Sequence, residues 1–64
     1  MLGENIKKIR KKRSLTQDKL ARLADIPYTS ITKIETGVIK SPSIQTVAKI
    51  AKALNVGVDD LLKT

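Results

Sequence analysis

Lysine and arginine are the chemically active side chains that this sequence carries in excess. Thirteen of them oppose six Asp and Glu, which gives a formal charge of +7 and an isoelectric point near 10.1. A small basic domain suits a polyanionic partner, such as nucleic acid, an anionic membrane or an acidic protein. The sequence has no Cys and no His. A disulfide, a thiol nucleophile, a Cys/His zinc site and His-based acid–base catalysis are therefore excluded, and we expect neither a cofactor nor enzyme activity.

The length and the apolar composition indicate one small helical domain. The chain has 64 residues, enough for a single core. Tyr28 is its only aromatic residue, so the core must be built from eight Ile, seven Leu, four Val and five Ala. No apolar run approaches the roughly 20 residues of a membrane span, and the first residues lack the apolar region of a signal peptide. We therefore expect a cytoplasmic protein that does not bind membranes.

Apolar residues at helical spacing, separated by start and stop signals, predict five helices. Thr16, Ser43 and Gly57 are suited to cap helix starts. Asp25 and Asn55 can end helices in the left-handed conformation. The predicted helices span residues 2–13, 16–24, 27–36, 43–54 and 57–63.

The segment 27–36 gives two conflicting signals. Its β-branched residues favour a strand. However, Ile31 and Ile34 are three residues apart, and Gly37 follows as a helix-ending glycine. We predict a helix with exposed side chains at Tyr28, Thr29, Thr32, Lys33 and Thr36. In the preceding helix, the predicted buried side consists of Leu20, Ala21, Leu23 and Ala24.

Two short helices joined by a tight turn, 16–24 and 27–36, have the arrangement of a helix-turn-helix. Specific motifs accompany them: Leu15-Thr16-Gln17-x-x-Leu20-Ala21, Ile31-x-x-Ile34-Glu35-x-Gly37, Pro42-x-Ile44, and Ala51-x-x-Leu54-x-Val56-x-Val58-x-x-Leu61-Leu62. With these motifs in register, essentially the whole chain resembles the helix-turn-helix family of lambdoid phage repressors and Cro, the XRE family. The resemblance implies an all-α fold, a compact five-helix bundle with a central helix-turn-helix. Asp25 replaces the turn glycine of the family, and Pro27 replaces its usual polar helix cap.

The resemblance also implies which residues contact double-stranded DNA. In the family the third helix lies in the major groove, and the matching residues that would contact bases are Tyr28, Thr29, Thr32 and Lys33. Lysine can donate to O6 and N7 of guanine, and a threonine methyl can contact thymine. The alternative for Tyr28 is that its ring only covers the start of its helix.

Contacts to the DNA backbone fix the position of such a domain on the duplex. The resemblance assigns them to the start of the second helix and to the loop after the third, at Thr16, Gln17, Lys40, Ser41 and Ser43. Free amides and the positive end of the helix dipole favour a phosphate near Gln17. Gln17 is also expected to brace the helices, and Lys40 has the alternative of being an ordinary solvated lysine.

The family pairs an arginine of the first helix with the glutamate of Glu-x-Gly, and here these are Arg10 and Glu35. We interpret the pair as structural, joining the first helix to the third. If it is buried, losing one partner would cost about 3–5 kcal/mol. An exposed pair would contribute less than about 1 kcal/mol.

Family members commonly act as homodimers on palindromic DNA, with half-sites roughly 34 Å apart. Ile44, Val56 and Val58 are the matching interface positions, with core packing as the alternative for each. The sequence thus predicts a transcriptional regulator, expected to be a repressor. Alternatives are an antitoxin or a restriction–modification controller with the same DNA-binding domain, or the DNA-binding fragment of a longer regulator. Membrane binding through the basic first helix and RNA binding are weaker hypotheses, because aromatic anchors and stacking platforms are missing.

Overall fold

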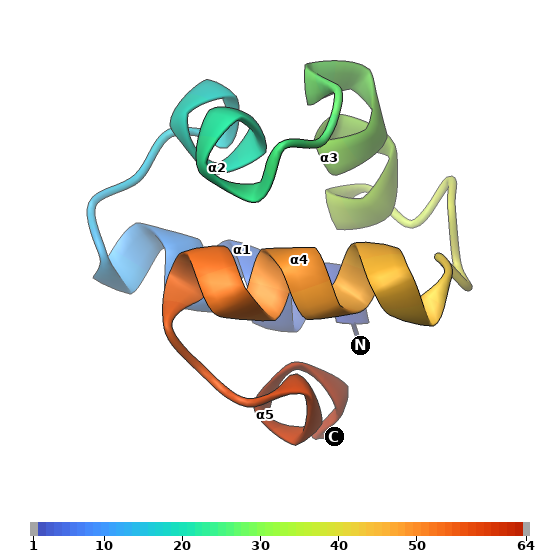
Figure 1. Cartoon of the computed structure of the whole chain (residues 1–64). Coiled ribbons are helices and arrows are strands. Elements are labelled where there is room, and N and C mark those ends of the chain that lie inside the picture. Colours follow the sequence, from blue (N-terminus) through green and yellow to red (C-terminus); the bar gives the residue numbers. More distant parts are fainter. Residues whose placement is uncertain (1, 64) are drawn as a thin grey trace.

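The computed structural model describes residues 2–63, which form five α-helices and no strand. The helices are α1 (Leu2–Lys12), α2 (Gln17–Ala24), α3 (Tyr28–Glu35), α4 (Ile44–Leu54) and α5 (Val58–Leu62). Each lies within one of the predicted ranges, and the predicted all-α fold is confirmed. In Figure 1, α4 crosses the middle of the molecule, with α2 and α3 above it and α5 below it.

Most helix boundaries follow from the predicted capping residues. The Thr16 hydroxyl accepts a hydrogen bond from the Lys19 amide at 3.0 Å, and the Ser43 hydroxyl accepts one from the Thr46 amide at 3.2 Å. Asp25 (φ 57°) and Asn55 (φ 59°) end α2 and α4 in the left-handed conformation. Each cap satisfies amides or carbonyls that the helix itself leaves without partners.

The end of α1 contains a left-handed residue that the sequence did not predict. Ser14 has φ 57°. Its amide donates to Lys11 O at 3.0 Å, and the Leu15 amide donates back to Arg10 O at 3.0 Å. This pair of bonds turns the chain sharply from α1 toward α2.

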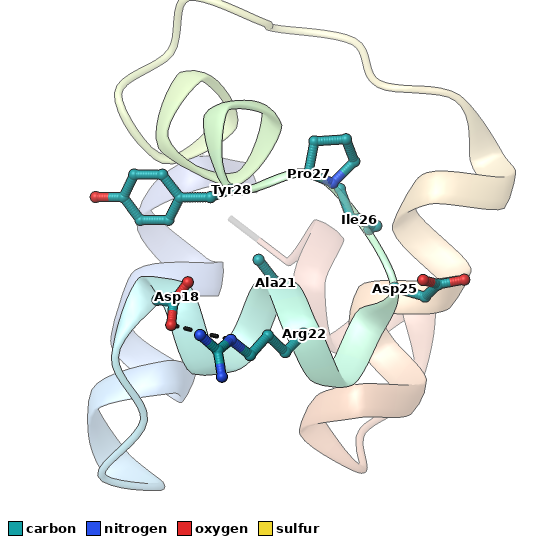
Figure 2. A pocket seen from close by; sticks show the side chains of 7 residues that line it. All are labelled: Asp18, Ala21, Arg22, Asp25, Ile26, Pro27 and Tyr28. Carbon is teal, nitrogen blue, oxygen red and sulfur yellow. Dashed lines mark ion pairs between the residues drawn. The ribbon is translucent and has the colours of Figure 1, made fainter.

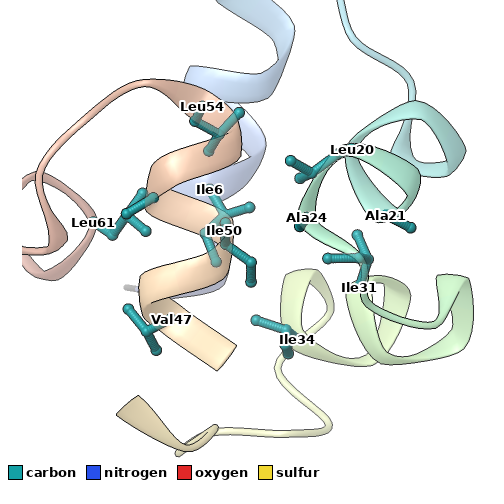
Figure 3. Packing of buried hydrophobic residues seen from close by; sticks show 11 residues of the cluster. Ile6, Leu20, Ala21, Ala24, Ile31, Ile34, Val47, Ile50, Leu54 and Leu61 are labelled. Carbon is teal, nitrogen blue, oxygen red and sulfur yellow. The ribbon is translucent and has the colours of Figure 1, made fainter. Parts of the chain in front are cut away.

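Eleven aliphatic residues form one buried core, contributed by all five helices (Figure 3). Those with no exposed surface include Ile6 of α1, Leu20 of α2, Ile31 of α3, Ile50 of α4 and Leu61 of α5. Figure 3 shows Ile50 near the centre, with side chains of α2 and α3 on one side and Leu61 on the other. Because each helix buries its apolar stripe against the others, no helix is expected to be stable alone.

Two expectations about exposure were wrong. Leu23 was placed on the buried side of α2, but it is 53% exposed. The buried residues of α2 are Leu20, Ala21 and Ala24, so the buried stripe is narrower than the run of apolar residues suggests. Thr32 was expected to be exposed, but it is half-buried on α3.

α1 holds the bundle together at two places. A Cβ added at Gly3 would lie 2.3 Å from Ile34 O and 2.9 Å from Glu35 O, so α1 approaches the end of α3 at a distance that only glycine allows. Further along α1, the side-chain Nδ2 of Asn5 donates to Leu61 O at 2.8 Å and to Lys63 O. Asn5 therefore satisfies carbonyls at the end of α5.

None of the helices in residues 2–63 has the length and apolar character needed to cross a membrane. The same part of the chain contains no group of three or more Asp and Glu placed to hold a metal ion.

Candidate nucleic-acid interface

α3 presents one polar face to solvent. Thr29, Lys33 and Thr36 are exposed, and Tyr28 is 49% exposed. The opposite face carries Ile31 and Ile34, which are buried in the core. Helical periodicity thus places four of the five predicted polar residues on the accessible side, with the half-buried Thr32 beside them.

The threonine hydroxyls of α3 are already hydrogen-bonded within the helix. Thr32 Oγ1 donates to Thr29 O at 2.8 Å, and Thr36 Oγ1 donates to Thr32 O at 2.9 Å. Since each hydroxyl has one proton, these groups keep acceptor capacity and a methyl group for an outside partner. Lys33 is the only cationic side chain in α3, so it is the strong donor of this face.

The turn between α2 and α3 sets how the two helices meet. The Asp25 amide donates to Arg22 O at 3.2 Å, and the Ile26 amide donates to Ala21 O at 3.0 Å. Asp25 thus adopts the left-handed conformation at the position of the family's turn glycine, as expected. Pro27 then starts α3 with φ −56° and provides no side-chain hydrogen bond to the helix start. The first amides of α3 consequently remain available to an outside acceptor.

The ion pair expected between Arg10 and Glu35 is present and buried. Arg10 Nε lies 2.8 Å from Glu35 Oε2, and a second guanidinium nitrogen lies 3.1 Å from Oε1. The side chains are only 10% and 2% exposed. Arg10 also donates to Leu15 O at 2.7 Å. The two-pronged contact joins α1 to the end of α3 and matches the structural role expected for the pair.

Gln17 extends this buried pair to the surface. Its Nε2 donates to Glu35 Oε1 at 3.1 Å, and its Oε1 lies 3.5 Å from the Tyr28 hydroxyl. The start of α2 and the exposed start of α3 are therefore joined by one chain of polar contacts that begins at Arg10. This agrees with the bracing role expected for Gln17, and it places Tyr28 beside the first turn of α2.

The other predicted backbone-contact residues lie in two places. Thr16 is exposed and caps α2, next to Gln17. Lys40 and Ser41 are exposed in the loop after α3. Ser43 lies at the end of that loop, where its hydroxyl caps α4 and lies 2.9 Å from Thr46 Oγ1.

The three predicted interface residues differ in accessibility. Ile44 is 68% exposed at the start of α4. Val56 and Val58 are half-buried and pack against the core. In the loop before α4, Val38 is 72% exposed while Ile39 packs against the core.

A hollow of about 360 Å³ lies on the outer side of the α2–α3 turn (Figure 2). Asp18 and Asp25 lie at its edges, and Arg22 is paired with Asp18 at 3.2 Å. Tyr28 also lines the hollow, so the hollow borders the candidate interface, but its two carboxylates oppose the binding of a phosphate there.

A family model for helix-turn-helix proteins matches residues 6–61. The chain belongs to the helix-turn-helix family. The HTH-type transcriptional regulator SinR of Bacillus subtilis is 34% identical over 62 residues, which are 97% of this chain and 56% of SinR. The HTH-type transcriptional regulator YqaE of the same species is 38% identical over 63 residues, or 98% of this chain and 53% of YqaE. The chain therefore spans about half the length of these relatives.

Solved structures of SinR have the same fold. SinR in complex with DNA superimposes with a TM-score of 0.95 at 33% identity, covering 98% of this chain and all of that one. A complex of SinR with the SinI protein gives a TM-score of 0.94 at 33% identity, covering 98% of this chain and 61% of that one. The predicted resemblance to XRE-type helix-turn-helix proteins is thereby confirmed.

Sequence reasoning missed Gly3 and Asn5, which help to position α3 and α5. No motif points to either residue. A glycine inside a predicted helix was the one available signal of a close contact between backbones.

Proposed function

We propose that this chain is a sequence-specific double-stranded DNA-binding domain of a transcriptional regulator, with α3 as its major-groove recognition helix. It acts by binding and carries out no catalysis. The site of action is the cytoplasm, where bacterial DNA lies. Because the relatives are about twice as long, we propose that the chain corresponds to the DNA-binding part of a longer regulator.

One observation carries this proposal. The polar face of α3 is exposed next to the start of α2, and the buried Arg10–Glu35–Gln17 contacts fix the two helices relative to each other. A rigid helix whose outer face carries Tyr28, Thr29 and Lys33 fits the major groove, which is about 12 Å wide. The solved structure of SinR in complex with DNA, which superimposes with a TM-score of 0.95, supports DNA binding by this fold.

The side chains divide into two groups by chemistry. Lys33 donates to guanine, and the methyl group of Thr29 or Thr32 contacts thymine. The Tyr28 ring packs on a thymine methyl or a sugar, because its hydroxyl is turned toward Gln17. Thr16, Gln17, Lys40, Ser41 and Ser43 border the phosphates on either side of the groove, and the net charge of +7 adds sequence-independent attraction.

We further propose that the protein represses transcription as a homodimer that covers a palindromic operator. Exposed Ile44 is the part of the expected interface best placed to meet a second copy, with half-buried Val56 and Val58 beside the core. The half-sites would then lie about one helical turn apart, roughly 34 Å.

Selection of bound duplexes from a random library tests this function. We expect an enriched palindrome with half-sites about 10 base pairs apart. Reporter transcription from a promoter that overlaps the enriched site should fall when the protein is expressed. If no motif is enriched and binding simply disappears at about 200 mM salt, the +7 charge alone attracts DNA and the proposal is wrong.

A further inference from the structure

The exposed Leu23 marks a groove on the side of the molecule away from the candidate interface. The groove lies between the end of α2 and the outer side of α4. Its lining is partly apolar, from Leu23, Ala24 and Ala53, and it carries two lysines of α4, Lys49 and Lys52, against one carboxylate, Asp25. In Figure 2, Asp25 at this end of α2 points away from the direction taken by Tyr28. None of the residues that line the groove is a proposed DNA-contact residue, so a partner in the groove would leave the polar face of α3 accessible.

The short helix α5 has the complementary chemistry. Asp59 is exposed, and Leu62, three residues later on the same side of the helix, is 54% exposed. The neighbouring carboxylate, Asp60, is already used by the Gly57 amide at 3.0 Å and by Lys63 at 3.3 Å. Asp59 has no ion-pair partner within residues 2–63, so it is the carboxylate of α5 that can meet a lysine of another molecule.

The groove lies on the α2 side of α4, and α5 lies on the other side of α4. Figure 1 shows α2 above α4 and α5 below it. One copy therefore cannot fold its own α5 into its own groove, but two copies stacked in the same direction bring the two surfaces together. Such a contact joins unlike surfaces and leaves one of each free, so it can continue to a third copy.

We propose that α5 of one copy docks in the α2–α4 groove of a second copy, head to tail. Leu62 rests on Leu23 and Ala53, while Asp59 pairs with Lys49 or Lys52. The contact area is small, so the association is weak in free solution. The contact shares α5 with the proposed dimer but uses Asp59 and Leu62, whereas the dimer uses Ile44, Val56 and Val58, and its solution test does not depend on DNA binding.

Two complementary charge-reversed variants test the proposal. Asp59→Lys disables the α5 surface and leaves the groove intact. Lys49→Glu/Lys52→Glu disables the groove and leaves α5 intact. All three positions are exposed, so both variants should keep the fold, which thermal unfolding will verify. We expect each variant alone to self-associate about 5- to 10-fold more weakly than the parent chain, as for like charges brought together at the edge of an interface.

Mixing the two variants gives the decisive result. In the mixture the intact groove of one variant meets the intact α5 of the other, and the reversed groove meets the reversed α5, so opposite charges face each other at both contacts. An equimolar mixture should therefore associate about as strongly as the parent chain in sedimentation equilibrium at about 150 mM salt, where surface charges are partly screened. Amide NMR shifts in the mixture should centre on the groove and α5 of each chain. The matched controls are Glu4→Lys and Lys8→Glu/Lys12→Glu, at exposed positions of α1. They change the net charge by the same amounts as the α5 variant and the groove variant. Because their contact surfaces are intact, they should self-associate as strongly as the parent chain.

Three outcomes would overturn the proposal. The parent chain would stay monomeric at millimolar concentration, the mixture would remain unassociated, or the α1 control variants would weaken association as much as the groove and α5 variants do. None of these outcomes tests the DNA-binding function, which the library selection tests separately.

Discussion

At the scale of single residues, the buried Arg10–Glu35 pair is the contact on which the position of α3 depends most. Glu35→Leu would leave the Arg10 guanidinium buried beside Leu15 O without its carboxylate. We expect the free energy of unfolding to fall by about 3–5 kcal/mol, a large share of the stability of so small a domain. Urea denaturation at low temperature measures this loss.

The control for this prediction is the double variant Arg10→Met/Glu35→Leu. It removes the stranded charge and fills the space with apolar side chains, so it should be more stable than Glu35→Leu alone. If the losses from the two single variants simply add in the double variant, Arg10 and Glu35 are not energetically coupled and our account of the pair is wrong.

Gly3 gives a second prediction at the residue scale. Helix propensity favours replacing this glycine by alanine, whereas packing opposes it. Replacing a helical glycine by alanine normally stabilises a helix by about 0.5–1 kcal/mol. Here the added Cβ would lie 2.3 Å from a backbone carbonyl of α3, so α1 must move. We expect Gly3→Ala to destabilise the protein by about 1–3 kcal/mol, measured by thermal unfolding.

Gly57→Ala is the matched control for Gly3→Ala. Its added Cβ would lie 3.1 Å from Asp59 Oδ1, an atom at the end of a flexible exposed side chain. We expect a loss below about 1 kcal/mol, typical of a helix cap. A stabilised Gly3→Ala protein would show that α1 and α3 are not in such close contact.

At the scale of the helices, the end of α1 contains removable strain. Ser14 is left-handed at φ 57°, a conformation that glycine adopts more easily. Ser14→Gly should therefore raise the free energy of unfolding by about 0.5–1 kcal/mol, less the entropy that glycine adds to the unfolded chain. Lys8→Gly, at an exposed position inside α1, should instead lose about 1 kcal/mol. Equal effects of the two substitutions in thermal unfolding would contradict the assigned helix end.

α5 is predicted to be sensitive to acid. The Gly57 amide, and then Lys63, lower the pKa of Asp60 below its ordinary range. A lowered folded-state pKa stabilises the protein above the pKa of the unfolded chain, about 3.9, and this stabilisation is lost as the pH falls further. NMR signals of α5 should therefore change below about pH 4 in the parent chain, in a step that Asp60→Asn lacks. A titration midpoint of Asp60 above about 4 would contradict the stated cause.

The sequence could predict the helices because their end residues have local preferences. Thr16, Ser43, Asp25 and Asn55 act at helix ends as their chemistry suggests. The exposure of Leu23 could not be predicted, because an apolar pattern gives the direction of a buried face but not the width that a crossing helix covers. Gly3 and Asn5 were missed since their partners lie far away in sequence.

At the scale of the whole molecule, the family motifs predicted which residues make up the candidate interface. They did not predict the contacts that make it rigid. The polar connection from Arg10 through Glu35 and Gln17 to Tyr28 depends on three helices meeting at one place. The pairing of Arg10 with Glu35 followed from the resemblance. The further contact of Gln17 with the same carboxylate depends on the tertiary structure.

The central claim is that α3 recognises bases through its exposed face, and Lys33 tests it most directly. The selection from a random duplex library should be repeated with Lys33→Ala. We predict that the variant enriches the same palindrome, with preference relaxed at one base pair of each half-site and a loss of about 1–3 kcal/mol at that position. A uniform loss of affinity with every preference unchanged would mean that Lys33 contacts only phosphate, and the proposed recognition by α3 would be contradicted.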